Sequence, residues 1–417
     1  MNLYNEKGAP NPITHCQKAG DDDLKWWREA RFGMFVHWGP AAIGGSDISW
    51  CRDSGYRPGD HNSFVEPVIP ARIYDNFYKE FNPVNYDARK WVQLVKDAGM
   101  SYIVLTAKHH DGFCLFDSRF TEYKSTAWDC PCQKDIVKEL ADACHEMGIK
   151  FGIYYSARDW YHSEYLKGDN SLYLQYYTSQ IVELLTNYGR VDMLWFDHIG
   201  GPHRLWNPDM ILRLARTLHP GILINDRLHA SVHDGRVSGY EGDFDTPEQQ
   251  VGKFNNHRPW ESCICLVGGV WSYKPDGVMM TFEQCIKTLV SCAGGDGNLL
   301  LNTGPMPDGI IEQRQQERFQ EIGLWLKKYG ESIYKTRGGP IMPTKDYACT
   351  FHDKTVYLHI FNIGQTYNLT GLKGNLESYN VLNGSAKAVM EGNELHISEI
   401  CGDECDIIIK ITMDCPQ

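Results

Sequence analysis

The sequence predicts an α/β protein in which a (β/α)8 TIM-like barrel is followed by a small C-terminal antiparallel β-sandwich. Short apolar runs alternate with amphipathic stretches through most of the 417 residues, as in parallel sheets with crossover helices. Polar residues stand at the ends of many of these runs. Beyond Gly338-Gly339-Pro340 the pattern changes to short alternating strands. We expect the barrel to span residues 1–335 and the sandwich residues 340–417.

Each element is predicted from its own pattern. The apolar runs of strand length are residues 32–38, 102–106, 151–155, 191–196, 222–225 and 298–302. Helical periodicity is present in residues 87–98, 135–147, 172–187, 209–218, 282–291 and 312–329. Asn85 or Asp87 can cap the first of these helices, and Gly99 can close it in a left-handed conformation. Sandwich strands are expected at residues 355–361, 394–397 and 405–412.

An open doubly wound sheet would also accommodate these strands. Ligands of an open sheet bind in one crevice, whereas the strand ends of a barrel all face one site. Here polar groups follow or end several different runs, namely His37, Lys108-His109-His110-Asp111, Ser156, Asp197 and Asp226-Arg227. No glycine fingerprint follows the first strand, which argues against a dinucleotide-binding fold. The polar strand ends therefore favour the barrel.

Composition limits the partners. The formal net charge of −12 argues against nucleic acid and against an anionic membrane surface. Aromatic residues make up 12% of the chain, which suits a site that stacks sugars and equally suits a large aromatic core. We expect no membrane span, a possible homo-oligomer, and free, mostly buried cysteines of a reducing compartment. The start of the chain has no apolar signal segment, so we expect a cytoplasmic protein, or a periplasmic or secreted one if a signal was removed.

Asp197 is the leading catalytic candidate. It ends an apolar run beside Trp195, and a carboxylate in this position is poorly explained as part of a core. A retaining glycosidase would use it as nucleophile together with a carboxylic acid about 5 to 5.5 Å away. The alternative is a cap on the following segment. Candidates for the acid are Asp243, Asp245, Glu248 and Glu261, and their pattern alone does not choose among them.

Basic and imidazole side chains surround this candidate. His109 and His110 could bind a metal together with His37, but neighbours on a strand point to opposite faces. Hydrogen bonding to sugar hydroxyls is the preferred interpretation, and one of the pair could be a structural histidine. Arg227 is a fixed donor fork suited to a hydroxyl or a carboxylate, or to a buried ion pair with Asp226.

Taken together, these motifs resemble glycoside hydrolase family 29, the α-L-fucosidases. They occur in family order across about residues 25–335. The matching segments are 26–39 (WWREARFGMFVHWG), 105–113 (LTAKHHDGF), 154–156 (YYS), 194–197 (LWFD), 225–227 (NDR), 246–248 (TPE), 260–261 (WE) and 298–305 (NLLLNTGP).

The resemblance implies a retaining exo-α-L-fucosidase that needs no metal or organic cofactor and acts on fucosylated oligosaccharides or glycosides. It implies that Asp197 is the nucleophile and that Glu248 is the acid/base, with Glu261 as the alternative, since the position of the acid differs among family members. The residues that it implies for sugar binding are His37, Trp50, His109, His110, Tyr155, Trp195, Arg227 and Trp271.

Two departures from the family pattern bear on specificity. Many members carry Glu-Trp where this chain has Ser49-Trp50, so one contact to a sugar hydroxyl is lost. His198 follows the nucleophile where relatives often have glycine. The alternatives are the same mechanism on an α-L-galactoside or another α-glycoside, a catalytically silent carbohydrate-binding protein, and a metal hydrolase using His37, His109 and His110.

Overall fold

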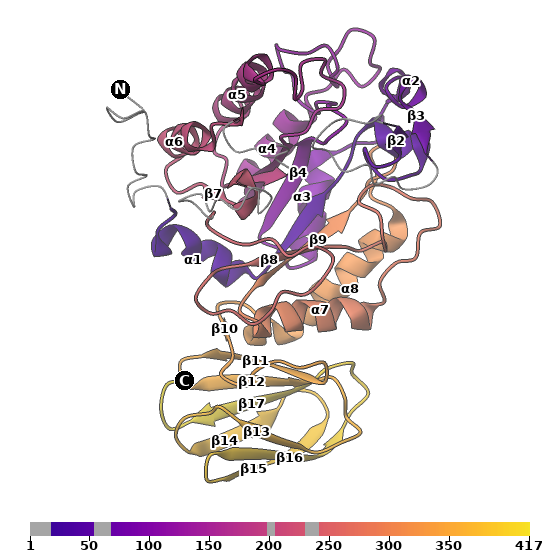
Figure 1. The fold of residues 1–417 in the computed structure, drawn as a ribbon. Helices are drawn as coiled ribbons and strands as arrows, with labels where there is room; N and C mark the ends of the chain where they lie inside the picture. The colour runs from indigo at the N-terminus through magenta and orange to yellow at the C-terminus, as the bar shows by residue number, and fades with distance from the viewer. Residues whose placement is uncertain (1–17, 54–67, 198–204, 230–241) are drawn as a thin grey trace, which may run out of the picture.

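The computed structural model describes residues 18–53, 68–197, 205–229 and 242–417 of the chain. A helix-covered, curled parallel sheet forms the larger part, and a β-sandwich lies beneath it in Figure 1. This arrangement confirms the predicted fold class. Within these residues, no helix combines the length and the apolar character that crossing a membrane requires. The cysteines of this part are all unbridged, and most of them are buried.

Seven parallel strands form the curled sheet in the order β7-β6-β5-β4-β1-β9-β8. Their bounds are β1 Phe32–Val36, β4 Tyr102–Lys108, β5 Lys150–Ser156, β6 Met193–Asp197, β7 Leu223–Ile224, β8 Glu261–Cys265 and β9 Asn298–Thr303. All the predicted strands are present. β8 was not among them, because its sequence ESCIC carries too few large apolar residues to stand out.

An irregular segment, residues 243–249, closes the ring between β7 and β8. Single bridges join Phe244 to Asn225 and Asp245 to Trp260, and a third joins Glu248 to Cys263. Backbone hydrogen bonds reach both neighbours, so this segment takes the place of the eighth strand. We call it the closing segment. Because the closing segment contains polar residues, the pattern of apolar runs in the sequence does not identify it as a strand.

Side chains of the strands alternate between two cores. One set fills the barrel interior: Phe35, Tyr102, Val104, Tyr154, Met193, Trp195, Leu223, Phe244, Cys263 and Leu300. Their sequence neighbours, such as Ile153, Tyr155 and Phe196, pack outward against the helices. This period of two is the ordinary consequence of strand geometry. The alternation decides which of two successive strand residues faces the barrel interior.

Helices cover the outside of the sheet (Figure 1). The longer ones are α1 Asp21–Ala30, α3 Ala88–Asp97, α4 Ile136–Met147, α5 Ser171–Thr186, α6 Pro208–Leu218, α7 Phe282–Gly294 and α8 Gln313–Tyr329. Short turns add α2 Ala71–Tyr74, η2 Pro40–Gly44, η3 Phe77–Lys79, η5 Asp226–His229 and η6 Gly330–Ser332. Asp87 caps α3 by accepting from two backbone N–H groups, and Gly99 follows that helix at φ 75°, both as expected.

The C-terminal strands form two antiparallel sheets around a separate apolar core. One sheet has the order β10-β11-β12-β17-β14 and the other β13-β16-β15. Their bounds are β10 Arg337–Gly338, β11 Tyr347–His352, β12 Thr355–Ile360, β13 Tyr367–Thr370, β14 Leu376–Val381, β15 Ser385–Glu391, β16 Glu394–Cys401 and β17 Ile407–Met413. A short parallel pair, β2 Arg52–Asp53 and β3 Ile69–Pro70, lies in the barrel part.

An ion pair joins β10 to the barrel beside a buried ion pair of the barrel itself. Asp296, just before β9, accepts from Arg31 at 2.7 Å and also pairs with Arg337 of β10. Arg31 and Asp296 are both about 1% exposed. Since Asp296 is buried, losing its arginine partners would leave a buried charge without compensation.

Candidate active site

A pocket opens at the carboxyl ends of the barrel strands. Its lining comes from almost every strand and from the closing segment: Phe35, His37, Trp50, His109, Tyr154, Trp195, Asp197, Arg227, Glu248, Cys263 and Trp271. Most of the residues expected to bind or transform a sugar are thus brought together. This is the end of a (β/α)8 barrel where catalytic groups are found.

Asp197, the last residue of β6, lines the pocket. Tyr154 donates its hydroxyl proton to Asp197 Oδ2 at 2.6 Å, and Arg227 Nη1 donates to Oδ1 at 2.8 Å. Burial, and then the charge of Asp197, raises the pKa of Tyr154 well above its ordinary value, so the phenol keeps its proton. The carboxylate is therefore held in one orientation by two donors.

Arg227, from η5 after β7, also binds the second carboxylate of the pocket. Its Nη2 donates to Glu248 Oε2 at 2.9 Å, and its Nε donates to Thr246 Oγ1 at 2.9 Å. The guanidinium lies 4.7 Å above the ring of Trp195. One rigid cation therefore bridges Asp197 and Glu248. The Glu248 side chain is 40% exposed against 9% for Asp197, so Glu248 is the one that faces incoming solvent or ligand.

Three histidines form one wall. His37 and His109 line the pocket, and His110 Nε2 lies 3.8 Å from Asp197 Oδ2. Burial lowers the pKa of His37 to about 4, against a smaller upward effect of its bond to Asn302, so this ring is neutral at physiological pH.

Among the described residues, only one group of side chains is close enough together to hold a metal ion, and it lies in this wall. Donor atoms of His109, His110 and Asp197 lie within 4.8 Å of one another. The guanidinium of Arg227 on the same carboxylate opposes a second positive charge there. The arrangement therefore suits hydrogen bonding to hydroxyl groups better than it suits a cation.

Aromatic rings line the pocket beside the histidines. The ring of Trp271 lies 4.8 Å from that of His37 and 6.2 Å from that of Phe35. Asp47 Oδ1 accepts from the backbone N–H of Trp271 at 2.7 Å and so fixes the loop that carries this ring. Trp50 stands edge-on to His110, with ring centroids 5.0 Å apart. Phe35, Cys263 and Asp47 were not predicted from the sequence.

The expectation for Tyr155 is wrong. Its hydroxyl donates to Gln180 of α5 at 2.6 Å, and its ring packs in the outer core. Tyr154 faces the pocket instead, because successive side chains of β5 point to opposite faces. The period of two, counted back from Asp197 through its partner Ser156, would have identified Tyr154.

Glu261, the alternative candidate for the acid, does not line the pocket. It is the first residue of β8, at the amino end of the barrel, and it is fully buried. Its Oε2 accepts from Trp27 Nε1 at 3.1 Å and from the hydroxyl of Tyr102. Burial raises its pKa to about 7, although the neighbouring side chains of Tyr102, Trp27 and Trp195 act in the opposite direction.

Ser49 and His198 are the two positions at which the sequence differs from the family pattern. Ser49 is fully buried behind His109, and its Oγ lies 2.7 Å from His109 Nδ1. It therefore acts on the pocket through the histidine. His198 lies outside the described residues.

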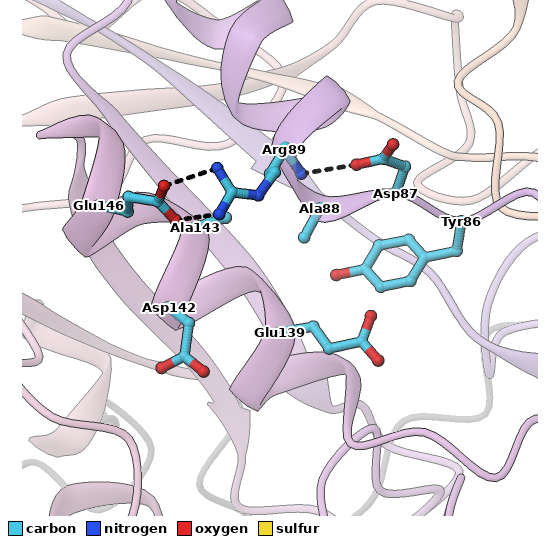
Figure 2. A pocket seen from close by; sticks show the side chains of 8 residues that line it. All are labelled: Tyr86, Asp87, Ala88, Arg89, Glu139, Asp142, Ala143 and Glu146. Atoms are coloured by element: carbon cyan, nitrogen blue, oxygen red, sulfur yellow. Dashed lines mark hydrogen bonds and ion pairs between the residues drawn. The ribbon is translucent and has the colours of Figure 1, made fainter.

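A larger hollow of about 350 Å³ lies on the outside of the barrel between α3 and α4 (Figure 2). Its lining is Tyr86, Asp87, Ala88, Arg89, Glu139, Asp142, Ala143 and Glu146. Most of the charges there pair with one another or with neighbours, as in Arg89 with Glu146 at 2.7 Å and Lys138 with Asp142 at 2.6 Å. No strand end contributes to it. The candidate active site is therefore the smaller pocket at the strand ends.

Comparison with known proteins points to one family. A family model described as Alpha-L-fucosidase matches residues 10–331. The plasma alpha-L-fucosidase of Homo sapiens is 31% identical over 355 residues, which cover 80% of this chain and 74% of that protein. The plasma alpha-L-fucosidase of Rattus norvegicus is 32% identical over 329 residues, covering 75% of this chain and 70% of that protein.

Solved structures agree. Alpha-L-fucosidase isoenzyme 1 from Paenibacillus thiaminolyticus superposes with a TM-score of 0.82 at 32% identity, covering 96% of this chain and all of that one (100%). A family 29 alpha-L-fucosidase from Bacteroides thetaiotaomicron, trapped as a covalent intermediate with 2-fluoro-fucosyl fluoride, has a TM-score of 0.80 at 26% identity, covering 95% and 97%.

Proposed function

Because this chain belongs to the alpha-L-fucosidase family, we propose that Asp197 is the nucleophile and Glu248 the acid/base of its reaction. The reaction is the hydrolysis of fucosylated glycosides with retention of configuration, as in the family's trapped covalent intermediate. The single observation that carries the assignment is the guanidinium of Arg227, which holds both carboxylates at one pocket. Retention requires two carboxyl groups about 5 to 5.5 Å apart on either side of the scissile bond.

The first step forms a glycosyl-enzyme. An Asp197 oxygen attacks the anomeric carbon, while Glu248 gives its proton to the leaving oxygen. Tyr154 and Arg227 keep the attacking carboxylate oriented and charged. In the second step Glu248 takes a proton from water, and the hydroxide that forms replaces Asp197 at the anomeric carbon. The sugar leaves with its original configuration, and both carboxyl groups return to their starting states.

Glu248 must carry a proton in the substrate complex. Its Oε2 accepts from Arg227 Nη2, and the carboxyl has to turn away from this donor to present its proton to the leaving oxygen. Glu248 is placed for such a movement because its side chain is 40% exposed and it stands on the closing segment. The second bond of the guanidinium, to Asp197, stays in place.

Fucose is the sugar that best suits the aromatic wall. Phe35 and the ring carbons of Trp271 offer an apolar surface for a methyl group, and Phe35 has no group that could bond to the hydroxyl of a hydroxymethyl group. An apolar pocket discriminates against an added hydroxyl by about 100-fold. We expect kcat/KM for a nitrophenyl α-L-fucoside to exceed that for the α-L-galactoside by about this factor. Equal values would support the alternative sugar.

Covalent labelling tests the assignment. A 2-fluorinated fucosyl donor slows the second step, and mass spectrometry of the digested protein should then place the label on Asp197. Azide should restore turnover to Glu248→Ala on an activated fucoside, whereas Glu261→Ala should gain nothing from azide. A label on another carboxylate would refute the nucleophile, and azide rescue of Glu261→Ala alone would refute the acid. Binding of fucose without any turnover would favour a silent carbohydrate-binding protein.

A further inference from the structure

Each of the three pocket histidines has a buried partner at Nδ1. His37 Nδ1 lies 2.7 Å from Asn302 Oδ1, His109 Nδ1 lies 2.7 Å from Ser49 Oγ, and His110 Nδ1 lies 2.6 Å from Ser156 Oγ. A neutral imidazole carries one N–H and one lone pair on nitrogen. The partner at Nδ1 therefore decides whether Nε2 donates or accepts a hydrogen bond.

Asn302 requires a donor from His37. The amide nitrogen Nδ2 of Asn302 donates to the backbone carbonyl of Trp271 at 2.7 Å. A carbonyl can only accept, so this contact fixes which end of the amide is nitrogen. The oxygen then faces His37, whose Nδ1 must carry the proton. His37 Nε2 keeps its lone pair as an acceptor.

The two serines impose the opposite state. Ser49 Oγ accepts from the backbone N–H of Asp111 at 2.9 Å, and Ser156 Oγ accepts from that of Arg158 at 3.0 Å. Both serines are fully buried, and in the described chain each hydroxyl bonds otherwise only to its histidine. Leaving a buried hydroxyl proton without an acceptor is unfavourable.

Each serine proton therefore goes to Nδ1 of its histidine. His109 and His110 then carry their own proton on Nε2.

We propose that Asn302, Ser49 and Ser156 are positioning residues. They fix the protonation of the three histidines, so that the wall presents one hydrogen-bond acceptor, His37 Nε2, and two hydrogen-bond donors, Nε2 of His109 and Nε2 of His110. This inference rests on the proposed function and specifies what the site recognises. The rings of His37 and His109 stand edge to face with centroids 5.5 Å apart, and a ligand group that contacts Nε2 of both must donate to the first and accept from the second. A free sugar hydroxyl does both, and an ether oxygen does not.

The same assignment matters for the nucleophile. His110 Nε2 lies 3.8 Å from Asp197 Oδ2. With a proton there, the ring presents a positive edge to the carboxylate and stabilises its charge. With the proton on Nδ1, a lone pair would face the carboxylate and repel it. The hydroxyl of Ser156 thus favours the ionised nucleophile through the ring of His110.

Nitrogen-15 NMR of the full-length protein labelled at histidine tests the proposal. Long-range proton–nitrogen correlations distinguish the two neutral tautomers, and single His→Gln variants assign the signals. At neutral pH we expect a proton on Nδ1 of His37 and on Nε2 of His109 and His110. Any other state of these rings would overturn the proposal. The spectrum does not depend on turnover, so this failure is distinguishable from failure of the covalent label to reach Asp197.

Variants at Ser156 add a functional readout. Ser156→Ala removes the donor to His110 and should give a mixture of tautomers there, with kcat lowered at least about tenfold. Ser156→Thr keeps the hydroxyl on a residue that suits a strand and should restore both. The matched control is Ser118→Ala, which removes a fully buried hydroxyl bonded to Glu183, on the outer side of the barrel. It should leave the histidine spectrum and kcat unchanged.

The positioning role is wrong if Ser156→Ala keeps a single His110 tautomer with its proton on Nε2. It is equally wrong if the control variant changes that tautomer as much as Ser156→Ala does.

Discussion

Replacing Glu261 with glutamine distinguishes a buried structural carboxyl from a catalytic acid. Glu261 is fully buried at the amino end of the barrel, where Trp27 and Tyr102 donate to its Oε2. Burial raises its pKa from 4.5 to about 7. Glutamine keeps the shape and one acceptor oxygen, but it does not titrate. The variant should therefore lose a pH dependence of stability and keep its activity.

The size and sign of this pH dependence of stability follow from the raised pKa of Glu261. Between pH 4.5 and about 7 the unfolded chain releases a proton that the folded protein keeps. The contribution of Glu261 to stability is therefore complete below pH 4.5 and is lost as the pH rises through about 7. At about 1.4 kcal/mol per pKa unit, the loss amounts to about 3 kcal/mol.

Urea unfolding of both proteins at pH 4.5 and pH 8 measures this change. The wild-type free energy of unfolding, relative to Glu261→Gln, should fall by about 3 kcal/mol between the two values. Turnover of a nitrophenyl fucoside by Glu261→Gln should stay within about twofold of wild type, whereas Glu248→Gln should lose about 100-fold or more. The reasoning fails if the stability difference is the same at both pH values, or if Glu261→Gln is as inactive as Glu248→Gln.

Four further predictions concern other parts of the molecule. Tyr154→Phe should lower kcat/KM at least about tenfold, because Asp197 loses a donor. Tyr155→Phe should keep kcat and lose about 1 kcal/mol of stability in urea, and equal kinetic effects would contradict the assignment of faces. Asp296→Asn should cost about 3 to 5 kcal/mol of stability by disrupting its pairs with Arg31 and Arg337, and an unchanged melting temperature would show that the contact is dispensable. Dialysis against a chelator should leave activity intact, whereas loss restored by zinc would make Asp197 a metal ligand.

The sequence predicts the fold well where the apolar pattern is strong. The strands β1, β4, β5, β6 and β9 are buried on both faces, so they stand out as apolar runs. β8 and the closing segment escape detection, because they carry polar residues and small thiols. Their place in the ring depends on backbone pairing with neighbours, which no local pattern reveals.

For the site, the sequence locates residues better than it orients them. Asp197 could be singled out because a carboxylate at the end of an apolar run is costly to bury unless it has a partner or a chemical role. Tyr154 and Tyr155 are chemically identical, and only the phase of the strand assigns one to the pocket. Glu248 and Glu261 both belong to recognisable motifs, but Glu248 lines the pocket at the carboxyl ends of the strands, whereas Glu261 is the first residue of β8. Separating them requires the register of β8.

Because Glu248 stands on the closing segment, its position can change without a change in the regular strands of the barrel. Regular ladders fix the neighbouring strands residue by residue, whereas this segment is bridged at Phe244, Asp245 and Glu248 alone. Residues inserted or exchanged between its bridges would displace the carboxyl of Glu248 without shifting the register of β6, which carries Asp197. Protein engineers who want new leaving-group preferences could therefore randomise this stretch and graft variants into an unchanged scaffold.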